Sequence, residues 1–391
     1  MDTLYPSEAH RRPRIPPYAI NTLAMAGTRG ARAWLDAELP NLVAAARTTA
    51  HSLPTNAIRL SSTLYRYLDG GHYDEGLAIH SCARQAAEQT GDRTGQAHAH
   101  RLLGSVHGRV GRYGLAIEHH RQALLWFQRT GDQSGEAMAL NGLGIAERCL
   151  GRYRSAVNSH ERALALFRRA NDSAGEANAL TNVSIVEVRL GRLRAAADYL
   201  QQALDLYRKL GNRTGEAAAL TNLGDVEERS GCYSAAADYH RRALDLLQEL
   251  GNVQGEAVVL KSLGIVHLRL EQPDQAIEHL ERALVIYLQI GDRAGEAFAL
   301  NGLGEAALAA GRLADAVSHH TSALSTAKST GARDQQARGS AGLGRAHHAT
   351  GEPVRARAHY EQALAIYAEL GMPEAEEVRE RLAQLADATG G

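Results

Sequence analysis

One phrase of sequence recurs every forty residues between Gly91 and Gly371. Residues 131–137 read Gly-Asp-Gln-Ser-Gly-Glu-Ala, residues 211–217 read Gly-Asn-Arg-Thr-Gly-Glu-Ala, and residues 291–297 read Gly-Asp-Arg-Ala-Gly-Glu-Ala. A fixed period of this size predicts a solenoid, in which each repeat buries its apolar face against its neighbours. The functional question therefore moves from catalysis toward binding on an extended surface.

Two helices are expected in each repeat. In the repeat that begins at Gly211, inward-facing residues are spaced by three and four, which is the period of an α-helix and not of a strand. The expected stripe of the first helix is Ala217, Leu220, Leu223, Val226 and Ser230, and that of the second is Tyr233, Ala236, Ala237, His240, Ala243, Leu244 and Leu247. The predicted fold class is an all-α, right-handed α-solenoid of helix-turn-helix repeats.

The expected helices also have recognisable ends. Gly231 and Gly251 follow the two helices of this repeat, where a left-handed C-cap favours glycine. Asn212 is placed to cap the first helix, as are Asp132 and Asp292 in other repeats. The repeated Gly-x3-Gly is accordingly interpreted as capping and turn chemistry, since a phosphate loop would need a strand before it and a lysine after it.

Outside the clear repeats the chain is less regular. Residues 1–27 contain three prolines between Pro13 and Pro17, and are predicted to be an irregular tether, or else a basic arm that contacts a partner. Residues 28–50 are predicted to form N-terminal capping helices, with Pro40 starting a second helical piece or kinking one. Residues 51–90 are a degenerate repeat, residues 91–370 form seven repeats, and residues 371–391 are expected to be a C-terminal capping helix.

Composition excludes several classes of function. With 43 basic and 44 acidic residues the net charge is −1, so the chain lacks the positive field that direct nucleic-acid binding requires. Three scattered cysteines predict neither a disulfide framework nor a zinc site. No apolar run is long enough for a membrane span, and the N-terminus has no secretion-signal pattern. We therefore expect a cytoplasmic protein without membrane contact.

Eighteen histidines raise the possibility of metal or catalytic chemistry. They fall in two adjacent repeat columns, the first with His119, His279, His319 and His359, the second with His120, His160, His240 and His320. Equivalent positions in stacked repeats are separated by a helix pair, or about 20 Å, which is too far for two of them to share a zinc ion. The sequence therefore predicts structural histidines, no metal, no cofactor and no enzymatic activity.

Two polar ladders on the first helices are candidates for ligand contact. The arginine column contains Arg109, Arg189, Arg229 and Arg269, with Arg148 and Lys261 close to it in helical phase. Such a ladder suits an acidic peptide or a phosphate, because guanidinium groups bind both through paired hydrogen bonds. The alternative is that each arginine pairs with a carboxylate of the repeats, such as Asp225 or the column of Glu147, Glu187 and Glu227.

The second ladder is formed by Asn141, Asn182, Asn222 and Asn301. Amides both donate and accept, so they can hold an extended peptide backbone whatever its sequence. Asn182 and Asn222 stand one position later than the other two, so the ladder is not strict. The alternative is that these are surface asparagines on a tolerant face.

The core spacings resemble the tetratricopeptide repeat. Leu220-x2-Leu223-Gly224, Ala236-x3-His240 and Ala243 fall on its signature positions, with leucine in place of tryptophan and histidine in place of phenylalanine. The unit is six residues longer than the usual 34, and the extra residues must lie between Ala243 and Leu260, which lengthens two helices. Pins-type polarity adaptors and kinesin light chains are similar in unit length, and the resemblance implies peptide binding in a concave groove.

A closer resemblance covers nearly the whole chain. The segments Trp34-Leu35-Asp36-Ala37-Glu38-x2-Asn41-Leu42 and Leu64-Tyr65-Arg66-Tyr67-Leu68, followed by these repeats, are similar to the C-terminal region of actinobacterial regulators of the Streptomyces antibiotic regulatory protein type. Those regulators place a DNA-binding domain and an NB-ARC ATPase before the repeats, and neither a winged helix nor a GxxxxGK[ST] loop occurs here. The chain is thus expected to be such a repeat region alone or a stand-alone relative.

The resemblance implies a regulatory module in the control of secondary metabolism. Its partner would be a protein or peptide segment, and the basic ladder suits an acidic one. A sensor of a small molecule or signalling peptide, or a stand-alone scaffold adaptor, are the alternatives.

Overall fold

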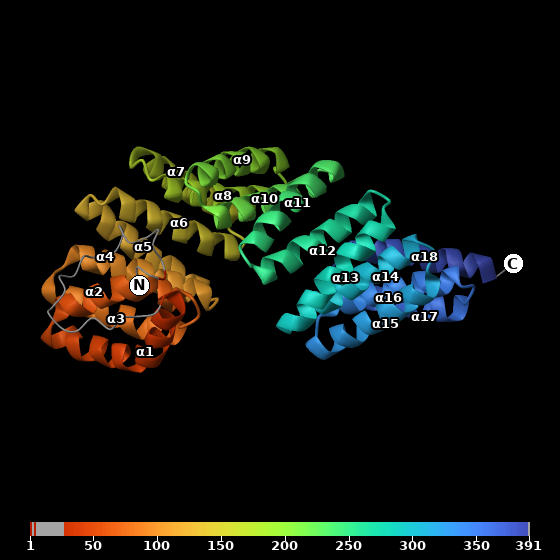
Figure 1. Cartoon of the computed structure of the whole chain (residues 1–391), viewed down its shortest axis with the longest axis horizontal. Coiled ribbons are helices and arrows are strands. Elements are labelled where there is room, and N and C mark those ends of the chain that lie inside the picture. Colours follow the sequence, from red (N-terminus) through yellow and green to blue (C-terminus); the bar gives the residue numbers. More distant parts are fainter. Residues whose placement is uncertain (2–3, 5–26, 390–391) are drawn as a thin grey trace. The chain divides into compact units, whose positions relative to one another are not determined.

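The computed structural model describes Met1, Leu4 and residues 27–389. Within these residues every regular element is an α-helix, and 18 helices follow one another as an all-α solenoid (Figure 1). The predicted tether or basic arm of residues 1–27 lies almost wholly outside the described part.

The helices alternate between the first and second helix of successive repeats. The first helices are α2 (Pro54–Asp69), α4 (Arg93–Arg109), α6 (Gln133–Cys149), α8 (Ser173–Arg189), α10 (Arg213–Arg229), α12 (Val253–Arg269), α14 (Arg293–Ala309) and α16 (Arg333–Ala349). The second helices are α3 (Tyr73–Thr90), α5 (Tyr113–Thr130), α7 (Tyr153–Arg169), α9 (Leu193–Lys209), α11 (Tyr233–Glu249), α13 (Pro273–Ile290), α15 (Leu313–Thr330) and α17 (Pro353–Leu370). The end helices are α1 (Gly27–Ser52) and α18 (Glu374–Thr389).

The chain divides into two compact units, Met1–Leu206 and Tyr207–Gly391, called unit 1 and unit 2 below. Consecutive helices pack against each other from α1 to α8 and from α10 to α18, and neighbouring first helices also contact each other directly, as α4 does with α2 and α6, and α14 with α12 and α16. The first helices of a unit therefore form one continuous surface, which we call its first-helix face. The boundary has no counterpart in the sequence, because the forty-residue period continues through it.

The helix ends follow the expected capping chemistry. The side chains of six N-cap residues each accept a hydrogen bond of 2.9 Å from the amide of the glycine three residues later. These N-caps are Asp92, Asp132, Asp172, Asn212, Asn252 and Asp292. Gly231 has a φ of 77°, which is the left-handed conformation that favours glycine after a helix.

The second glycine of each Gly-x3-Gly has a further cause. A Cβ on Gly135 would lie 2.2 Å from the Phe127 ring, and one on Gly295 would lie 2.3 Å from the Tyr287 ring. In four of the motifs the glycine is thus required because an aromatic ring from the preceding second helix packs on its backbone, while Leu247 packs on Gly255 in the same way. The interpretation of the motif as capping and turn chemistry alone was incomplete, since packing against a residue eight positions earlier also maintains it.

Buried rings of the second column pack on glycines of the first helices. A Cβ on Gly104 would lie 2.8 Å from the His120 ring, and one on Gly142 would lie 2.4 Å from the same ring. His120, His160, His240 and His320 are all at most 2 % exposed. The sequence placed these imidazoles in a partly buried seam, and the structure buries them completely, with glycines on both sides of His120 and His320 and on one side of His160 and His240.

Two details differ from the sequence-based expectation. Ser230 is exposed, so the apolar stripe of α10 ends at Val226, because the helix itself ends one residue before Ser230. Pro40 lies inside the single helix α1 and does not begin a second one. Between Ala243 and Leu260 the chain is helical except at residues 250–252, so the length beyond the usual repeat is indeed held in α11 and α12.

Candidate ligand-binding site

The first-helix face is lined by side chains at helical spacing, and α6 shows the pattern i, i+3 and i+7. In α6 these are Met138, Asn141 and Ile145, and all three line a pocket of about 250 Å³ in unit 1. A second pocket, of about 480 Å³, adjoins it and shares Asp69, Gly142 and Ile145 with it. We refer to the two together as the unit 1 pockets.

Arginines dominate the charge of the unit 1 pockets. Their lining includes one carboxylate, Asp69, and four guanidinium groups, those of Arg66, Arg101, Arg109 and Arg148. The Nε and Nη2 atoms of Arg109 donate to the two oxygens of Asp69 at 3.1 Å and 2.9 Å. The Nε of Arg148 is buried without a hydrogen-bond partner among the described residues. The lining of the unit 1 pockets therefore contains more arginines than carboxylates.

Part of the predicted arginine ladder is thus used in ion pairs within the protein. Arg109 pairs with a carboxylate, as the alternative proposed, but its partner Asp69 lies forty residues earlier, in the preceding repeat. The expected acidic column makes other contacts: Glu147 accepts from Ser155 and Ser159, and Glu187 pairs with Arg192. Both carboxylates are almost fully buried, because their column faces the second helix and not the ligand face.

The asparagines are also used internally. Asn141 Oδ1 contacts His160 Nδ1 at 2.9 Å and accepts from Asn182 at 3.1 Å, which links neighbouring repeats. Asn182 lines the larger unit 1 pocket. Asn301 is 0 % exposed, donates to the Gln335 carbonyl and contacts His320, so this structure does not present it to a ligand.

The remaining candidates are scattered. Arg189 is exposed at the end of α8, and Asn222 is half-buried on α10. The ammonium of Lys261 lies 4.7 Å from the centre of the Phe298 ring. Lys261 and Arg229 both lie close enough to Asp225 to lower its pKa, and Arg269 lines a pocket of unit 2. The structure therefore brings together Arg109, Arg148, Asn141 and Asn182, but does not join all ten candidates into one ladder.

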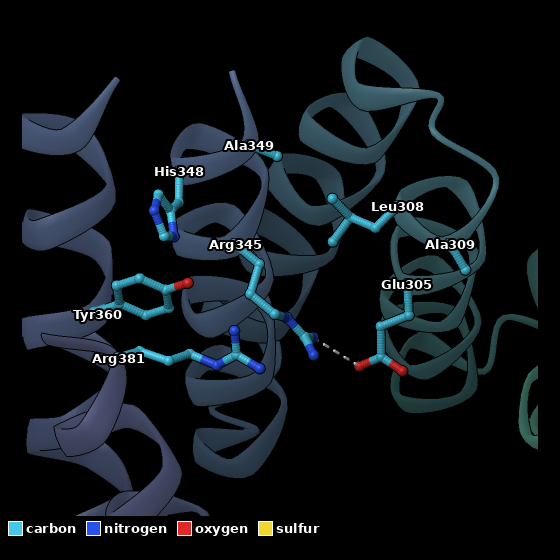
Figure 2. Close-up of a pocket in the computed structure, with 8 residues that line it drawn as sticks. All are labelled: Glu305, Leu308, Ala309, Arg345, His348, Ala349, Tyr360 and Arg381. Carbon is cyan, nitrogen blue, oxygen red and sulfur yellow. Dashed lines mark hydrogen bonds and ion pairs between the residues drawn. The ribbon is translucent and has the colours of Figure 1, made fainter. Parts of the chain in front are cut away.

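Unit 2 has two adjoining pockets of its own, of about 610 Å³ and 470 Å³. Figure 2 shows the smaller one, where the Tyr360 hydroxyl and the guanidinium groups of Arg345 and Arg381 converge opposite Glu305. Four arginines and four carboxylates line the two pockets together: Arg269, Arg338, Arg345, Arg381, Glu305, Asp334, Glu374 and Glu377.

Ion pairs balance this second face. Glu305 accepts from Arg338 twice at 2.8 Å and from Arg345 at 3.4 Å. Burial raises the pKa of Glu305, but the hydrogen bond and charge of Arg338, aided by Arg345, outweigh it and hold that pKa at about 2. Arg338 also stacks on Phe298, with 4.6 Å between the guanidinium carbon and the ring centre.

The sequence-based search missed the principal groups of the unit 2 pockets. Phe298 and Arg338 are equivalent residues of successive repeats, three positions before the Asn301 column. The same position holds His98, Met138 and Asn178 in unit 1. The residue type in this column varies between repeats, and the column lies at helical spacing from the asparagine ladder. Together these two features could have identified it as part of the ligand face from the sequence.

The histidines also come together in a way that their columns did not predict. His100 Nδ1 lies 3.0 Å from His119 Nδ1, and the rings of His107 and His119 are stacked. Burial, with the nearby charge of Arg101, lowers the pKa values of His80 and His120 to about 3. The columns correctly separate equivalent histidines, but they say nothing of contacts between different columns.

The fold and the faces define a class: an all-α repeat protein with polar pockets along its first helices. A tetratricopeptide repeat profile matches residues 67–124, 99–169, 135–209, 215–289, 256–329 and 295–369. The chain therefore belongs to the tetratricopeptide repeat family. A search of curated proteins found none that matches it.

Several solved structures share the fold. A signal-transduction ATPase (STAND) with a tetratricopeptide repeat sensor, from Pyrococcus horikoshii, is 17% identical with a TM-score of 0.67, over 93% of this chain and 56% of that one. A Rap protein complexed with competence and sporulation factor is 12% identical with a TM-score of 0.54, over 86% of this chain and 98% of that one. The apo quorum sensor NprR from B. thuringiensis is 11% identical with a TM-score of 0.54, over 85% and 98%.

These similarities are similarities of fold, and this chain spans only about half the length of the ATPase. None of the helices in the described part of the chain is both long and apolar enough to cross a membrane.

Proposed function

We propose that this protein is a non-catalytic binding module that holds an acidic segment of a protein or peptide on the first-helix face of unit 1. The observation that carries the proposal is the pair of arginines that line the larger unit 1 pocket: Arg109 has 57% of its side chain accessible, and the Nε of Arg148 has no hydrogen-bond partner among the described residues. An acidic ligand would bind these two guanidinium groups. A guanidinium–carboxylate hydrogen bond contributes about 1.5–3 kcal/mol.

The residues of the pockets would make different contributions to binding. Asp69 holds Arg109 in place through two hydrogen bonds, so little side-chain freedom is lost when a ligand arrives. The buried Nε of Arg148 would gain a partner. Met138 and Ile145 provide apolar contact on either side of Asn141 along α6.

The regulatory part of the proposal has independent support. The resemblance to the repeat region of actinobacterial antibiotic regulators favours a sensing role in transcriptional control of secondary metabolism, in the cytoplasm. Proteins that share the fold include an ATPase with a repeat sensor and a quorum sensor. Binding of the segment would then be the signal that the module transmits.

Titration of a fluorescein-labelled glutamate-rich peptide, followed by anisotropy, tests the proposal. We expect saturable binding that weakens as salt is added, since exposed charge pairs are screened. The double variant Arg109→Gln/Arg148→Gln should raise Kd at least about tenfold, which corresponds to about 1.4 kcal/mol.

The matched control is Arg121→Gln/Arg162→Gln. It changes the net charge equally, but both residues are exposed on the second helices α5 and α7. Equal loss of binding in the two double variants, or equal binding of a neutral peptide, would refute the use of this face.

A second candidate function is favoured by the smaller pocket of unit 2. Its 470 Å³ and the convergence of Arg345, Arg381 and Tyr360 suit a small acidic signal molecule (Figure 2). Thermal-shift screening of small carboxylic acids against wild type and Arg381→Gln would separate the two candidates. A stabilising compound whose effect is lost in Arg381→Gln, while the acidic peptide still binds, would support the small-molecule sensor.

A further inference from the structure

Three potential metal ligands meet on α10 and α11 in unit 2. Asp225 and Glu228 are three residues apart on α10 and therefore share a face, and His240 approaches them from α11. One ligand atom from each lies within 4.8 Å of the other two. The His240 ring is 0 % exposed, whereas 49% of the Asp225 side chain is accessible. The cluster is thus closed on the histidine side and open on the first-helix face.

His240 differs from most of the buried histidines of its column, and it lacks partners at both ring nitrogens, whereas His120 lacks one only at Nδ1. His80, His160 and His320 each have a partner for Nδ1, always the residue nineteen positions earlier: Ser61 at 2.7 Å, Asn141 at 2.9 Å and Asn301 at 3.2 Å. The equivalent residue for His240 is Thr221, and its hydroxyl donates to the Ala217 carbonyl instead.

Both ring nitrogens of His240 are consequently buried without a hydrogen-bond partner among the described residues. Its Nε2 lies 3.8 Å from Asp225 Oδ1, which is too long for a hydrogen bond. An unpaired polar group in the core is costly, and a bound ion would offset that cost.

The pair of carboxylates is specific to this repeat, although Glu305 places a single carboxylate at the Asp225 position of a later repeat. Isoleucine occupies the position of Asp225 in both neighbouring repeats, as Ile185 and Ile265, and Val188 and Leu268 replace Glu228. Two carboxylates are thus held side by side next to an imidazole whose ring nitrogens have no hydrogen-bond partner among the described residues.

We propose that Asp225, Glu228 and His240 form a binding site for a divalent ion of the zinc type. Each carboxylate would supply one oxygen and His240 its Nε2, and water would complete the coordination on the open side. Ligand atoms around tetrahedral zinc are about 3.4 Å apart, so side-chain rotations closing the cluster by about 1 Å suffice. The ion would join α10 to α11 and neutralise the carboxylate pair.

The opposing possibility is that Lys261, Arg229 and Arg269 already neutralise the two carboxylates. These cations compete with the metal ion for the same oxygens. Measured zinc binding decides between the two arrangements.

The experiment is calorimetric titration of the untagged, chelator-treated full chain with Zn²⁺, repeated for Asp225→Asn/Glu228→Gln. We expect the variant to bind one fewer zinc ion per chain than wild type, and zinc to raise the Tm of wild type more than that of the variant. The comparison cancels zinc held elsewhere, for example at His100 and His119. Equal stoichiometry and equal stabilisation would overturn the proposal.

A second pair of variants tests the histidine. His240→Leu should also lose one zinc ion, and the fold should tolerate it, because Leu280 occupies the equivalent place between Gly264 and Gly302. His160→Leu is the matched control, since that ring has no carboxylates beside it. Co²⁺ in place of Zn²⁺ gives a spectroscopic check, because a nitrogen–oxygen site with few ligands produces visible absorption. A Co²⁺ spectrum unchanged by His240→Leu would contradict ligation by this residue.

Discussion

The first-helix faces of unit 1 and unit 2 are built from the same repeat columns but differ in charge. Four arginines and one aspartate line the pockets of unit 1, whereas four arginines and four carboxylates line those of unit 2. The glycines, alanines and leucines that hold the helices together are alike in both units. The comparison shows that the scaffold and the ligand face are set by different columns, so that one can vary while the other is kept.

The units also differ in how their arginines are held. The pair of Arg109 with Asp69 in unit 1 leaves 57% of the arginine side chain accessible, whereas Arg338 and Glu305 in unit 2 are each 23% accessible. Exposed pairs contribute little to stability, while breaking a buried pair leaves an uncompensated charge. The same kind of contact is therefore a positioning device in unit 1 and a structural one in unit 2.

The largest expected difference between the two units is in their stability at low pH. Burial is the main cause that lowers the pKa of seven histidines to about 3 or 4. The five in unit 1 are His80, His98, His119, His120 and His160. The two in unit 2 are His240 and His320. Between these values and the unfolded value of about 6.5, only the unfolded chain binds the proton. Stability is thus present above pH 6.5 and is lost as the pH falls toward 4, by about 1.4 kcal/mol per pH unit for each fully buried ring.

Unit 1 should therefore unfold first as the pH is lowered. Both tryptophans, Trp34 and Trp126, lie in unit 1, so their emission maximum reports on that unit, while far-ultraviolet circular dichroism reports on both. We expect the emission maximum to shift at a higher pH than the loss of half the helical signal. Coincident transitions would show that the histidines do not distinguish the units.

Removal of a carboxylate should destabilise the two units to different extents. Glu305→Gln leaves Arg338 without its charge partner and should lower the free energy of unfolding by roughly 3 kcal/mol. Asp69→Asn affects an accessible arginine and should cost less than about 1 kcal/mol. Urea denaturation of both variants measures the difference, and similar costs would remove the distinction between the two pairs.

The scaffold itself should respond alike in both units. A Cβ on Gly142 of unit 1 would lie 2.4 Å from His120, and one on Gly342 of unit 2 would lie 2.2 Å from His320. Each change to alanine should cost about 2 kcal/mol, because the ring cannot move aside between two helices. Gly302→Ala, at 3.1 Å from Leu280, should cost less and serves as the reference in thermal melts. A large difference between the first two variants would argue against a common scaffold.

The smallest effect is expected from transferring charge between the faces. Ser105 lines both unit 1 pockets and is the repeat equivalent of Glu305. Ser105→Glu should raise the Kd for the acidic peptide severalfold, because it gives unit 1 a carboxylate like that of unit 2. The change corresponds to about 1 kcal/mol of binding free energy. Ile265→Glu is the matched change in a unit 2 pocket and should leave peptide affinity unchanged. Equal effects would place the peptide on both faces or on neither.

Much of the fold could be predicted from sequence because its causes are local. The glycine after each helix and the Asp or Asn before the next act within four residues, and Asn212 caps α10 as its position indicated. Buried stripes follow helical spacing, and Leu223 and Val226 are each 2 % exposed. The arrangement of the candidate site was less predictable, because Arg109 bonds to Asp69 forty residues away and Asn301 is buried by α16.

The sequence by itself determined the repeat, its helices, their caps and the positions of the buried rings, because each depends on a pattern repeated in every unit. Only the tertiary structure decided which variable side chains meet: Arg338 with Glu305, His100 with His119, and His240 with Asp225. It also decided where the chain divides into two units, within a helix that the period does not interrupt. These contacts depend on distances between helices, and a one-dimensional period carries the spacing along each helix but not the pairing across them.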